Sequence, residues 1–214
     1  MKRLFAILAL CLLLTGCGVF SDPAASYKNE TPTAQLPTDG KEAKELCRLI
    51  RMMVQNTPYL TPFDSPGEAA DLYRDGILCA VLTENYAKYN ANADLIARAK
   101  EAHPLLEVTT VIPALDFEST VYRCFGGSSS VGNLSTPLFT YFSDIDVYVS
   151  VGIGVDNSAD IFIEDLYETE HTYVCAFYNE MNGQRSDVYR LLAVKREDGT
   201  VYIKSLEIQN KREG

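Results

Sequence analysis

The sequence predicts an α+β fold in which N-terminal helices pack on one face of a curved antiparallel sheet, after a signal peptide and a disordered linker. Apolar residues recur at helical spacing between about residues 41 and 103. From residue 138 onward they fall in short runs rich in β-branched and aromatic residues, with turn residues between the runs. Segregation of helices from strands is typical of the α+β class, and 214 residues are enough for one domain.

The chain starts with a pattern that resembles the signal peptide and lipobox of bacterial lipoproteins. Lys2 and Arg3 precede an unbroken apolar run over residues 4–14, which ends in the lipobox Leu14-Thr15-Gly16-Cys17. The run is too short to cross a hydrocarbon core of about 30 Å as a helix. The resemblance implies cleavage after residue 16, attachment of diacylglycerol to the Cys17 thiol and, often, acylation of the new amino group, for example by palmitate. The alternative is an ordinary secretory signal with Cys17 as a bystander.

A lipid on Cys17 would hold the protein on the outer face of the cytoplasmic membrane, because two or more acyl chains anchor a protein stably. Residues 17–40 contain Pro23, Pro32 and Pro37 among small polar residues and show no sustained apolar period, so we expect a disordered tether there. Cleavage would leave 198 residues and change the formal net charge from −10 to −12. Such an acidic chain is repelled by nucleic acid, which is therefore not an expected partner.

Two long helices are expected at the start of the domain, which we place at residues 41–210. The first covers 41–54 and carries one apolar stripe at positions i, i+3, i+4 and i+7. The second starts at the capping box Ser65-Pro66-Gly67-Glu68 and continues to Val81. Its stripe contains Gly76, where we expect a bend or close backbone packing, since glycine costs a helix about 1 kcal/mol relative to alanine.

The middle of the chain changes its period twice. A third, shorter helix is expected over 93–102, with Asn92 as its N-terminal cap. Residues 105–112 contain a β-branched run that favours a strand. Residues 116–125 return to helical spacing, and Gly126 is placed to cap that helix at its C-terminus.

The C-terminal half is predicted to be an antiparallel meander. Its expected strands cover 138–142, 147–153, 160–167, 173–178, 187–195 and 200–208. Asp198-Gly199, between the last two, is typical of a tight hairpin. The strand over 173–178 is apolar on both faces, which predicts a central position in the sheet.

Four cysteines follow Cys11 of the signal peptide and Cys17 of the lipobox. Each lies within an apolar pattern: Cys47, Cys79, Cys124 and Cys175. We expect free thiols that pack in the core as small hydrophobes, with disulfides as the alternative that export permits. The absence of CxxC and CxxH spacing argues against a metal site.

Short signatures within residues 41–208 are Val111-Ile112-Pro113, the helix end Cys124-Phe125-Gly126-Gly127 and the closing strands. With these signatures the chain resembles the small exported lipoproteins of Firmicutes that have an NTF2-like, cystatin-related α+β core. The resemblance implies a cone-shaped domain with a cavity between a bent sheet and its helices. The superfamily uses that cavity for ligand binding, for small-molecule catalysis or for protein contacts alone. None of the signatures is catalytic, so the resemblance implies neither catalytic residues nor a cofactor.

The two histidines limit acid–base chemistry. His103 precedes a proline at an expected helix end, where a cation suits the helix dipole, and we interpret it as structural. His171 lies among acidic residues in an expected hairpin loop. It is a candidate general base or half of a metal site, although a loop histidine among acids is typically a solvated surface group.

Three polar segments resemble sites only superficially. The loop over 126–132 lacks the lysine of a phosphate-binding loop and the GxSxG spacing of a nucleophile elbow. The segment over 156–160 offers oxygen ligands but lacks the EF-hand pattern, so a plain turn is expected. Asp144 and Asp146 are interpreted as a polar strand edge or turn.

Tyrosine is the unusual feature of the composition, with 13 tyrosines and no tryptophan. Tyr122, Tyr141 and Tyr148 are, with His171, the candidate pocket residues. Several tyrosines on one sheet face would form an amphipathic binding platform. The alternative is that they fill the sheet, where aromatic residues are favoured.

The sequence therefore favours a lipid-anchored, non-catalytic binding or accessory module of the cell envelope, with an unidentified protein or small molecule as its partner. The alternative is a small NTF2-like envelope enzyme that uses His171 with a nearby carboxylate. A solute receptor of a transporter is disfavoured because such receptors usually have two lobes.

Overall fold

The computed structural model describes residues 27, 30–54, 58–127, 132–150 and 159–209. The chain divides into two compact units, Met1–Thr31 and Pro32–Gly214, and every helix and strand named below belongs to the second. Within the described residues the strands form two antiparallel sheets, one of six strands and one of three. The α+β class is confirmed, but the expected single sheet is wrong.

The larger sheet carries most of the C-terminal half. Its strands are β1 (Ala34–Gln35), β5 (Asp160–Glu168), β6 (Thr172–Met181), β7 (Gln184–Arg185), β8 (Tyr189–Lys195) and β9 (Val201–Ile208). The order is β1-β5-β6-β8-β9, with β7 paired to β6, so β6 is central as predicted. The β8–β9 hairpin turns at Gly199, whose φ is +80°.

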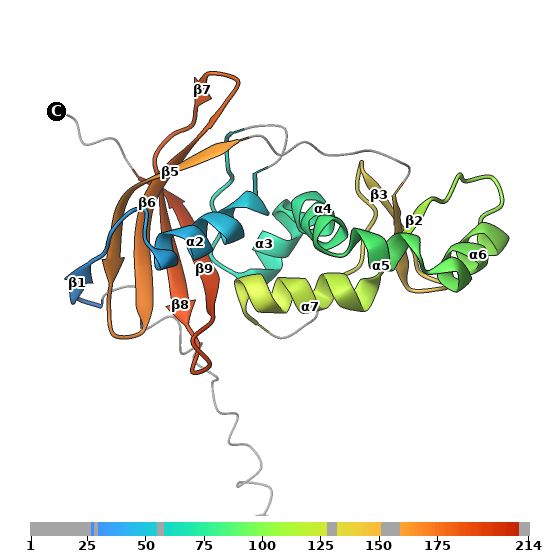
Figure 1. The fold of residues 1–214 in the computed structure, drawn as a ribbon, viewed down its shortest axis with the longest axis horizontal. Coiled ribbons are helices and arrows are strands. Elements are labelled where there is room, and N and C mark those ends of the chain that lie inside the picture. The colour runs from blue at the N-terminus through green and yellow to red at the C-terminus, as the bar shows by residue number, and fades with distance from the viewer. Residues whose placement is uncertain (1–26, 28–29, 55–57, 128–131, 151–158, 210–214) are drawn as a thin grey trace, which may run out of the picture. The chain divides into compact units, whose positions relative to one another are not determined.

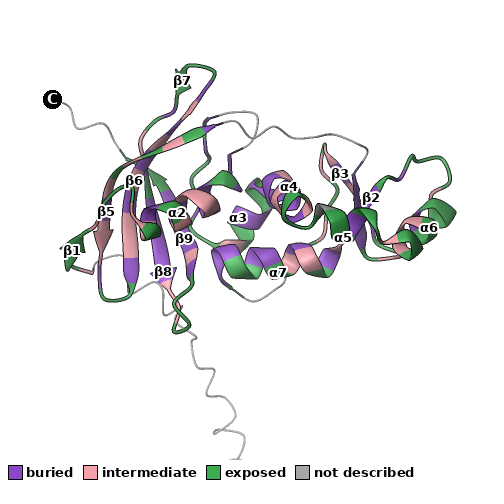
Figure 2. Ribbon diagram, in the orientation of Figure 1, coloured by how far each residue is buried: buried purple, intermediate pink, exposed green. Residues whose placement is uncertain are grey.

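Helix α2 (Lys41–Arg51) lies across one face of this sheet (Figure 1). Its buried apolar residues are Ala43, Leu46, Leu49 and Ile50, on the stripe that the sequence predicts. They pack in one core with Cys175 and Phe177 of β6, and both of those side chains are fully buried. Figure 2 shows buried residues on β6, β8 and β9 and also on α3 (Pro66–Leu72), α4 (Arg74–Glu84) and α7 (Ala114–Phe125).

The expected second helix is interrupted, and the break is not at Gly76. Helix α3 (Pro66–Leu72) ends at Tyr73, and α4 (Arg74–Glu84) follows with Gly76 buried inside it. The Tyr73 hydroxyl donates to the Thr61 carbonyl, and its ring packs edge-on against Phe63 at 5.8 Å. These tertiary contacts accompany the break at Tyr73, and a helical pattern in the sequence does not contain them. The predicted cap is present, because the Ser65 hydroxyl accepts from the Glu68 amide.

The smaller sheet has helices on both of its faces. It consists of β2 (Thr110–Pro113), β4 (Val147–Ser150) and β3 (Phe139–Phe142), in that order. One face joins the main core with α7 (Ala114–Phe125), and the other forms a separate cluster with α6 (Ala93–Ala102). The expected strand over 105–112 starts only at Thr110. Leu105 is 98% exposed, so this apolar residue faces solvent and is not part of a buried strand.

The last part of the expected tether belongs to the fold. The Thr33 amide donates to the Glu168 carbonyl at 2.7 Å, and the Leu36 amide donates to the Leu166 carbonyl at 2.8 Å. Strand β1 thereby pairs with β5, and the Leu36 side chain packs against the core. Hydrogen bonds to a distant strand edge order this polar segment, and its own composition does not show them. The rest of the expected tether and the lipobox lie outside the described residues, apart from residues 27 and 30–32.

All four cysteines of the domain lie in the described part of the chain and are free thiols there. Cys79, Cys124 and Cys175 are buried, whereas Cys47 is half-buried. Burial raises the pKa of Cys79 to about 12 and raises the pKa of the other three thiols as well. These cysteines therefore pack as protonated, small apolar groups.

None of the helices in the described ranges combines the length and the hydropathy that crossing a bilayer requires.

Helix α5 (Tyr86–Asn90) is a further element that the sequence did not predict. Its Lys88 ammonium and Tyr89 hydroxyl both lie 2.8 Å from the Asp116 carboxylate at the start of α7. Burial alone would raise the pKa of Asp116, but hydrogen bonds from Lys88 and Tyr89 outweigh it and lower that pKa. The charged form of Asp116 therefore stabilises the folded state.

We expect Asp116→Asn to lower the free energy of unfolding by about 1 kcal/mol at pH 7, because Asn keeps the shape and loses the charge. A carboxyl whose folded pKa is depressed stabilises above its unfolded pKa, and this contribution is lost as the pH falls through the folded value. The urea-unfolding curves of the two proteins should thus converge below the ordinary pKa of 3.8. Glu101→Gln, at an exposed position of α6, is the control and should change the free energy of unfolding at pH 7 by less than about 0.5 kcal/mol. A difference in the free energy of unfolding between the wild type and Asp116→Asn that stays constant down to pH 2 would contradict the role of the charge.

Candidate functional site

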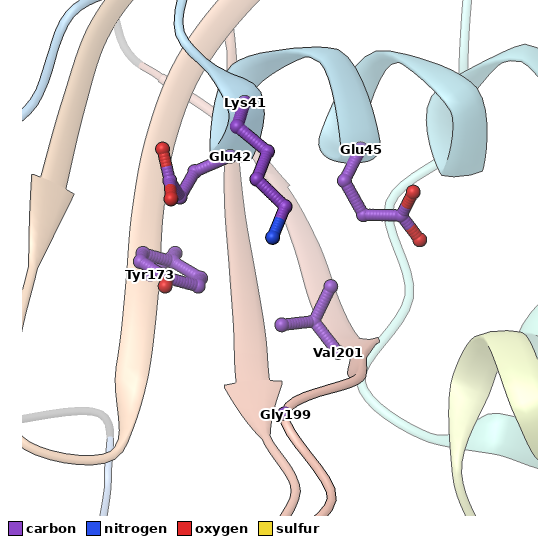
Figure 3. A pocket seen from close by; sticks show the side chains of 6 residues that line it. All are labelled: Lys41, Glu42, Glu45, Tyr173, Gly199 and Val201. Atoms are coloured by element: carbon purple, nitrogen blue, oxygen red, sulfur yellow. The ribbon is translucent and has the colours of Figure 1, made fainter.

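A recess opens where the start of α2 passes over the larger sheet (Figure 3). Its volume is about 170 Å³. The lining residues come from α2, β6, the β8–β9 turn and β9: Lys41, Glu42, Glu45, Tyr173, Gly199 and Val201. The Lys41 side chain extends from α2 between those of Glu42 and Glu45. It points toward the space between Tyr173 and Val201 (Figure 3). One ammonium, two carboxylates, a phenol and an apolar wall therefore surround one small space.

Two of the charges near the recess are engaged by the protein. The Glu45 carboxylate pairs with Arg48 at 2.9 Å, and Arg48 also reaches Glu84 at 3.4 Å. On the other side, Lys195 Nζ lies 2.7 Å from Glu168 and 4.9 Å from the centroid of the Tyr173 ring. Burial, with a smaller contribution from the carboxylates of Glu168 and Glu42, raises the pKa of the Tyr173 phenol. The phenol is therefore a neutral group that can donate or accept a hydrogen bond.

Two of the four predicted pocket residues, Tyr141 and Tyr148, lie together. They face each other across β3 and β4, with ring centroids 5.1 Å apart. The Tyr148 hydroxyl accepts from Arg74 at 2.9 Å and donates to Asn133 at 2.9 Å. The Tyr141 hydroxyl donates to Asp146, and this hydrogen bond raises the pKa of Tyr141 to about 12. Both hydroxyls have protein partners, which favours the interpretation that these tyrosines fill the structure.

Tyr122 lies elsewhere, near the C-terminal end of α7, and is 56% exposed. The Arg196 guanidinium lies 5.5 Å from the centroid of its ring and 4.7 Å from that of Tyr202. Arg196 also donates to the carbonyls of Tyr122 and Arg123, at 2.7 and 2.9 Å. Tyr122 is thus part of a helix cap formed by Arg196.

The two histidines belong to different elements of the fold. His171 is in the β5–β6 turn, with its side chain 48% exposed and Nε2 3.8 Å from the exposed carboxylate of Glu170. His103 follows α6, where it stacks on Phe142 at 3.5 Å and lies 3.4 Å from Asp144. The stacking on Phe142 supports the structural interpretation of His103.

Two of the polar segments fall largely outside the described residues, which include only the ends of 126–132 and of 156–160. Asp146 has a positive φ of 55°, which is typical of a turn, and it accepts from Tyr141. Among the described residues, no group of three or more His, Cys, Asp or Glu side chains is arranged to hold a metal ion.

The sequence did not single out Lys41, Glu42 or Tyr173 as site residues. They are separated by about 130 positions and form no motif. The sequence does predict a helix that starts at Lys41 and a central strand that starts at Tyr173. Neither prediction says which side chains of the two elements lie close together.

Comparison with known proteins identifies no relative from which a site can be transferred. No family model matches the chain, and neither the curated proteins nor the solved structures include a significant match. Functional conclusions for this chain therefore depend on its own residues and their geometry.

Proposed function

We propose that the protein is a lipoprotein anchored by Cys17 on the outer face of the cytoplasmic membrane, whose domain is a non-catalytic binding or accessory module of the cell envelope. The observation that carries this proposal is the lipobox Leu14-Thr15-Gly16-Cys17 at the end of a basic and apolar leader. The mature chain would be strongly acidic, so the acyl chains rather than a basic patch would supply the membrane affinity.

The geometry of the recess supports a binding role. Its volume of about 170 Å³ is below the range of about 300–1,000 Å³ that is typical of pockets for drug-sized ligands. Four of the six lining residues, Lys41, Glu42, Glu45 and Tyr173, are charged or hydroxylated, and Val201 is apolar. The residues lining this recess are therefore suited to hold a small polar group.

We further propose that the domain has an NTF2-like architecture. Helix α2 on one face of a larger antiparallel sheet supports it, and the three-stranded sheet with α6 would be an addition to that core. The space between α2 and the middle of the sheet is filled by side chains such as Leu46, Leu49 and Phe177. This filling favours a binding module over the alternative of a cavity enzyme that uses His171, whose side chain is half exposed beside a solvated carboxylate.

The test of the anchor is metabolic labelling with palmitate in a Firmicutes host, followed by membrane fractionation. We expect the wild-type chain to incorporate label and to sediment with the membranes. Cys17→Ala should lose the label and appear in soluble form. Cys11→Ala, in the apolar part of the leader, is the matched control and should behave as the wild type. A labelled Cys17→Ala protein, or one that stays on the membrane, would overturn the anchor.

A further inference from the structure

The recess contains two opposite charges that the protein itself does not use. Lys41 and Glu42 are adjacent in the first turn of α2, and both side chains line the recess. Within the described ranges neither side chain makes a hydrogen bond or an ion pair. The Tyr173 hydroxyl likewise has no hydrogen-bond partner in that part of the chain.

The neighbouring charges differ in this respect. Glu45 is held by Arg48, and Lys195 is held by Glu168 and by the Thr169 carbonyl at 2.7 Å each. The ion pairs at the rim therefore leave one ammonium and one carboxylate to face the space. The Val201 side chain provides the apolar wall opposite them (Figure 3).

We propose that this recess binds the head group of a small α-amino acid, in which an ammonium and a carboxylate are attached to one carbon. The ligand carboxylate pairs with Lys41 Nζ, the ligand ammonium pairs with Glu42, and the Tyr173 hydroxyl hydrogen-bonds to either group. A short side chain on the ligand lies against Val201. Small α-amino acids are thus the ligand class that we assign to the proposed binding module.

The zwitterion is preferred because of the charges at the site. A simple anion would pair with Lys41 but would approach the carboxylate of Glu42, and a simple cation would pair with Glu42 but would approach Lys41. Like charges brought together at the site oppose binding. A ligand that carries both charges satisfies both side chains at once. The volume of about 170 Å³ limits the ligand to a small amino acid.

This inference rests on the proposed binding role but not on the lipid anchor. Palmitate labelling tests the anchor in the membrane, whereas ligand binding is measured on the purified full-length chain in detergent. If labelling succeeds and titration fails, only the ligand proposal is overturned. If labelling fails and titration succeeds, only the anchor is overturned.

The experiment is a calorimetric titration of the full-length chain with glycine, L- and D-alanine and leucine. N-acetylalanine and alaninamide serve as ligand controls, because each lacks one of the two charges. We expect saturable binding of at least one of the free amino acids. N-acetylalanine and alaninamide should bind about tenfold more weakly than alanine or not at all, since a hydrogen bond to a charged group typically contributes a factor of this order.

The variants Lys41→Met and Glu42→Gln should each weaken binding about tenfold. Lys44→Met removes an exposed charge from the same helix outside the recess and should leave binding unchanged. Thermal unfolding of each variant separates loss of the site from loss of the fold. The proposal is overturned if no free amino acid binds, if alaninamide or N-acetylalanine binds as tightly as alanine, or if folded Lys41→Met binds as the wild type does.

Discussion

Gly126→Ala should destabilise the protein by about 3–5 kcal/mol, because alanine at this position is opposed both by the backbone and by a neighbouring ring. Gly126 ends α7 with φ 68° and ψ 179°, a region that is essentially restricted to glycine. A Cβ atom added there would lie 2.5 Å from Cε2 of Tyr202. Tyr202 lies beneath the Arg196 guanidinium, which is itself bound to the last carbonyls of α7, so the ring is held in place.

The measurement is urea unfolding of the full-length chain, followed by far-UV circular dichroism. Gly183→Ala is the matched control, since Gly183 also has a positive φ, of 77°, but a Cβ atom there would meet no atom within 4 Å. It should cost only about 1–2 kcal/mol. In the double variant Gly126→Ala/Tyr202→Ala the clash between the new Cβ atom and the Tyr202 ring is absent. Gly126→Ala should therefore lower the free energy of unfolding by less in the Tyr202→Ala background than in the wild type. Equal losses for Gly126→Ala and Gly183→Ala would contradict the close contact with Tyr202.

The sequence predicted those elements whose signals are local. The stripe of Leu46, Leu49 and Ile50 is enough to identify α2, because a helix that faces a sheet needs apolar residues at a spacing of three to four. Helix α6 is predicted to the residue, because the Asn92 side chain caps it at the Leu95 amide. Gly126 was predicted as the end of α7 for a similarly local reason.

Elements held by distant residues were not predicted. Five residues are too few to form α5 in isolation, and Asp116 holds this helix from 27 positions away. The division into two sheets depends on the partner of β4, which is β2 across an antiparallel register from Thr110 to Pro113. Nothing in the alternation of Val147–Ser150 distinguishes that partner from β5, since both faces of β4 are buried.

The candidate site could not be predicted from local sequence patterns either, because it too is formed by residues that are far apart in the chain. Glu42 is an ordinary residue for the first turn of a helix and Tyr173 is an ordinary residue for a strand, while Lys41 belongs to no motif. They become a site only because the start of α2 and strand β6 line the same recess. The predicted tyrosines Tyr141 and Tyr148 did come together, since they face each other in an antiparallel pair, but their hydroxyls serve the protein.

Arg74 is the second position at which a single substitution should have a large effect. Its side chain is only 4% exposed. One guanidinium nitrogen donates to the Tyr148 hydroxyl at 2.9 Å, another donates to Asp71 at 2.7 Å, and the group lies 5.0 Å from the centroid of the Phe117 ring. Through these contacts Arg74 links α3 and α4 with α7 and with the smaller sheet. Arg74→Ala should therefore lower the free energy of unfolding by about 3–4 kcal/mol, through lost packing and lost hydrogen bonds.

Two further variants separate these contributions. Arg74→Met keeps most of the packing volume and should cost about 2 kcal/mol, the part due to the hydrogen bonds and the cation–π contact. Arg98→Ala, an exposed arginine of α6, should change stability by less than about 0.5 kcal/mol. If Arg74 stabilises the fold through Tyr148, Tyr148→Phe should cost less in the Arg74→Met background than in the wild type, because the shared hydrogen bond is lost only once. Strictly additive effects of Arg74→Met and Tyr148→Phe would show that the buried hydrogen bond does not contribute, and the role of Arg74 would then be packing alone.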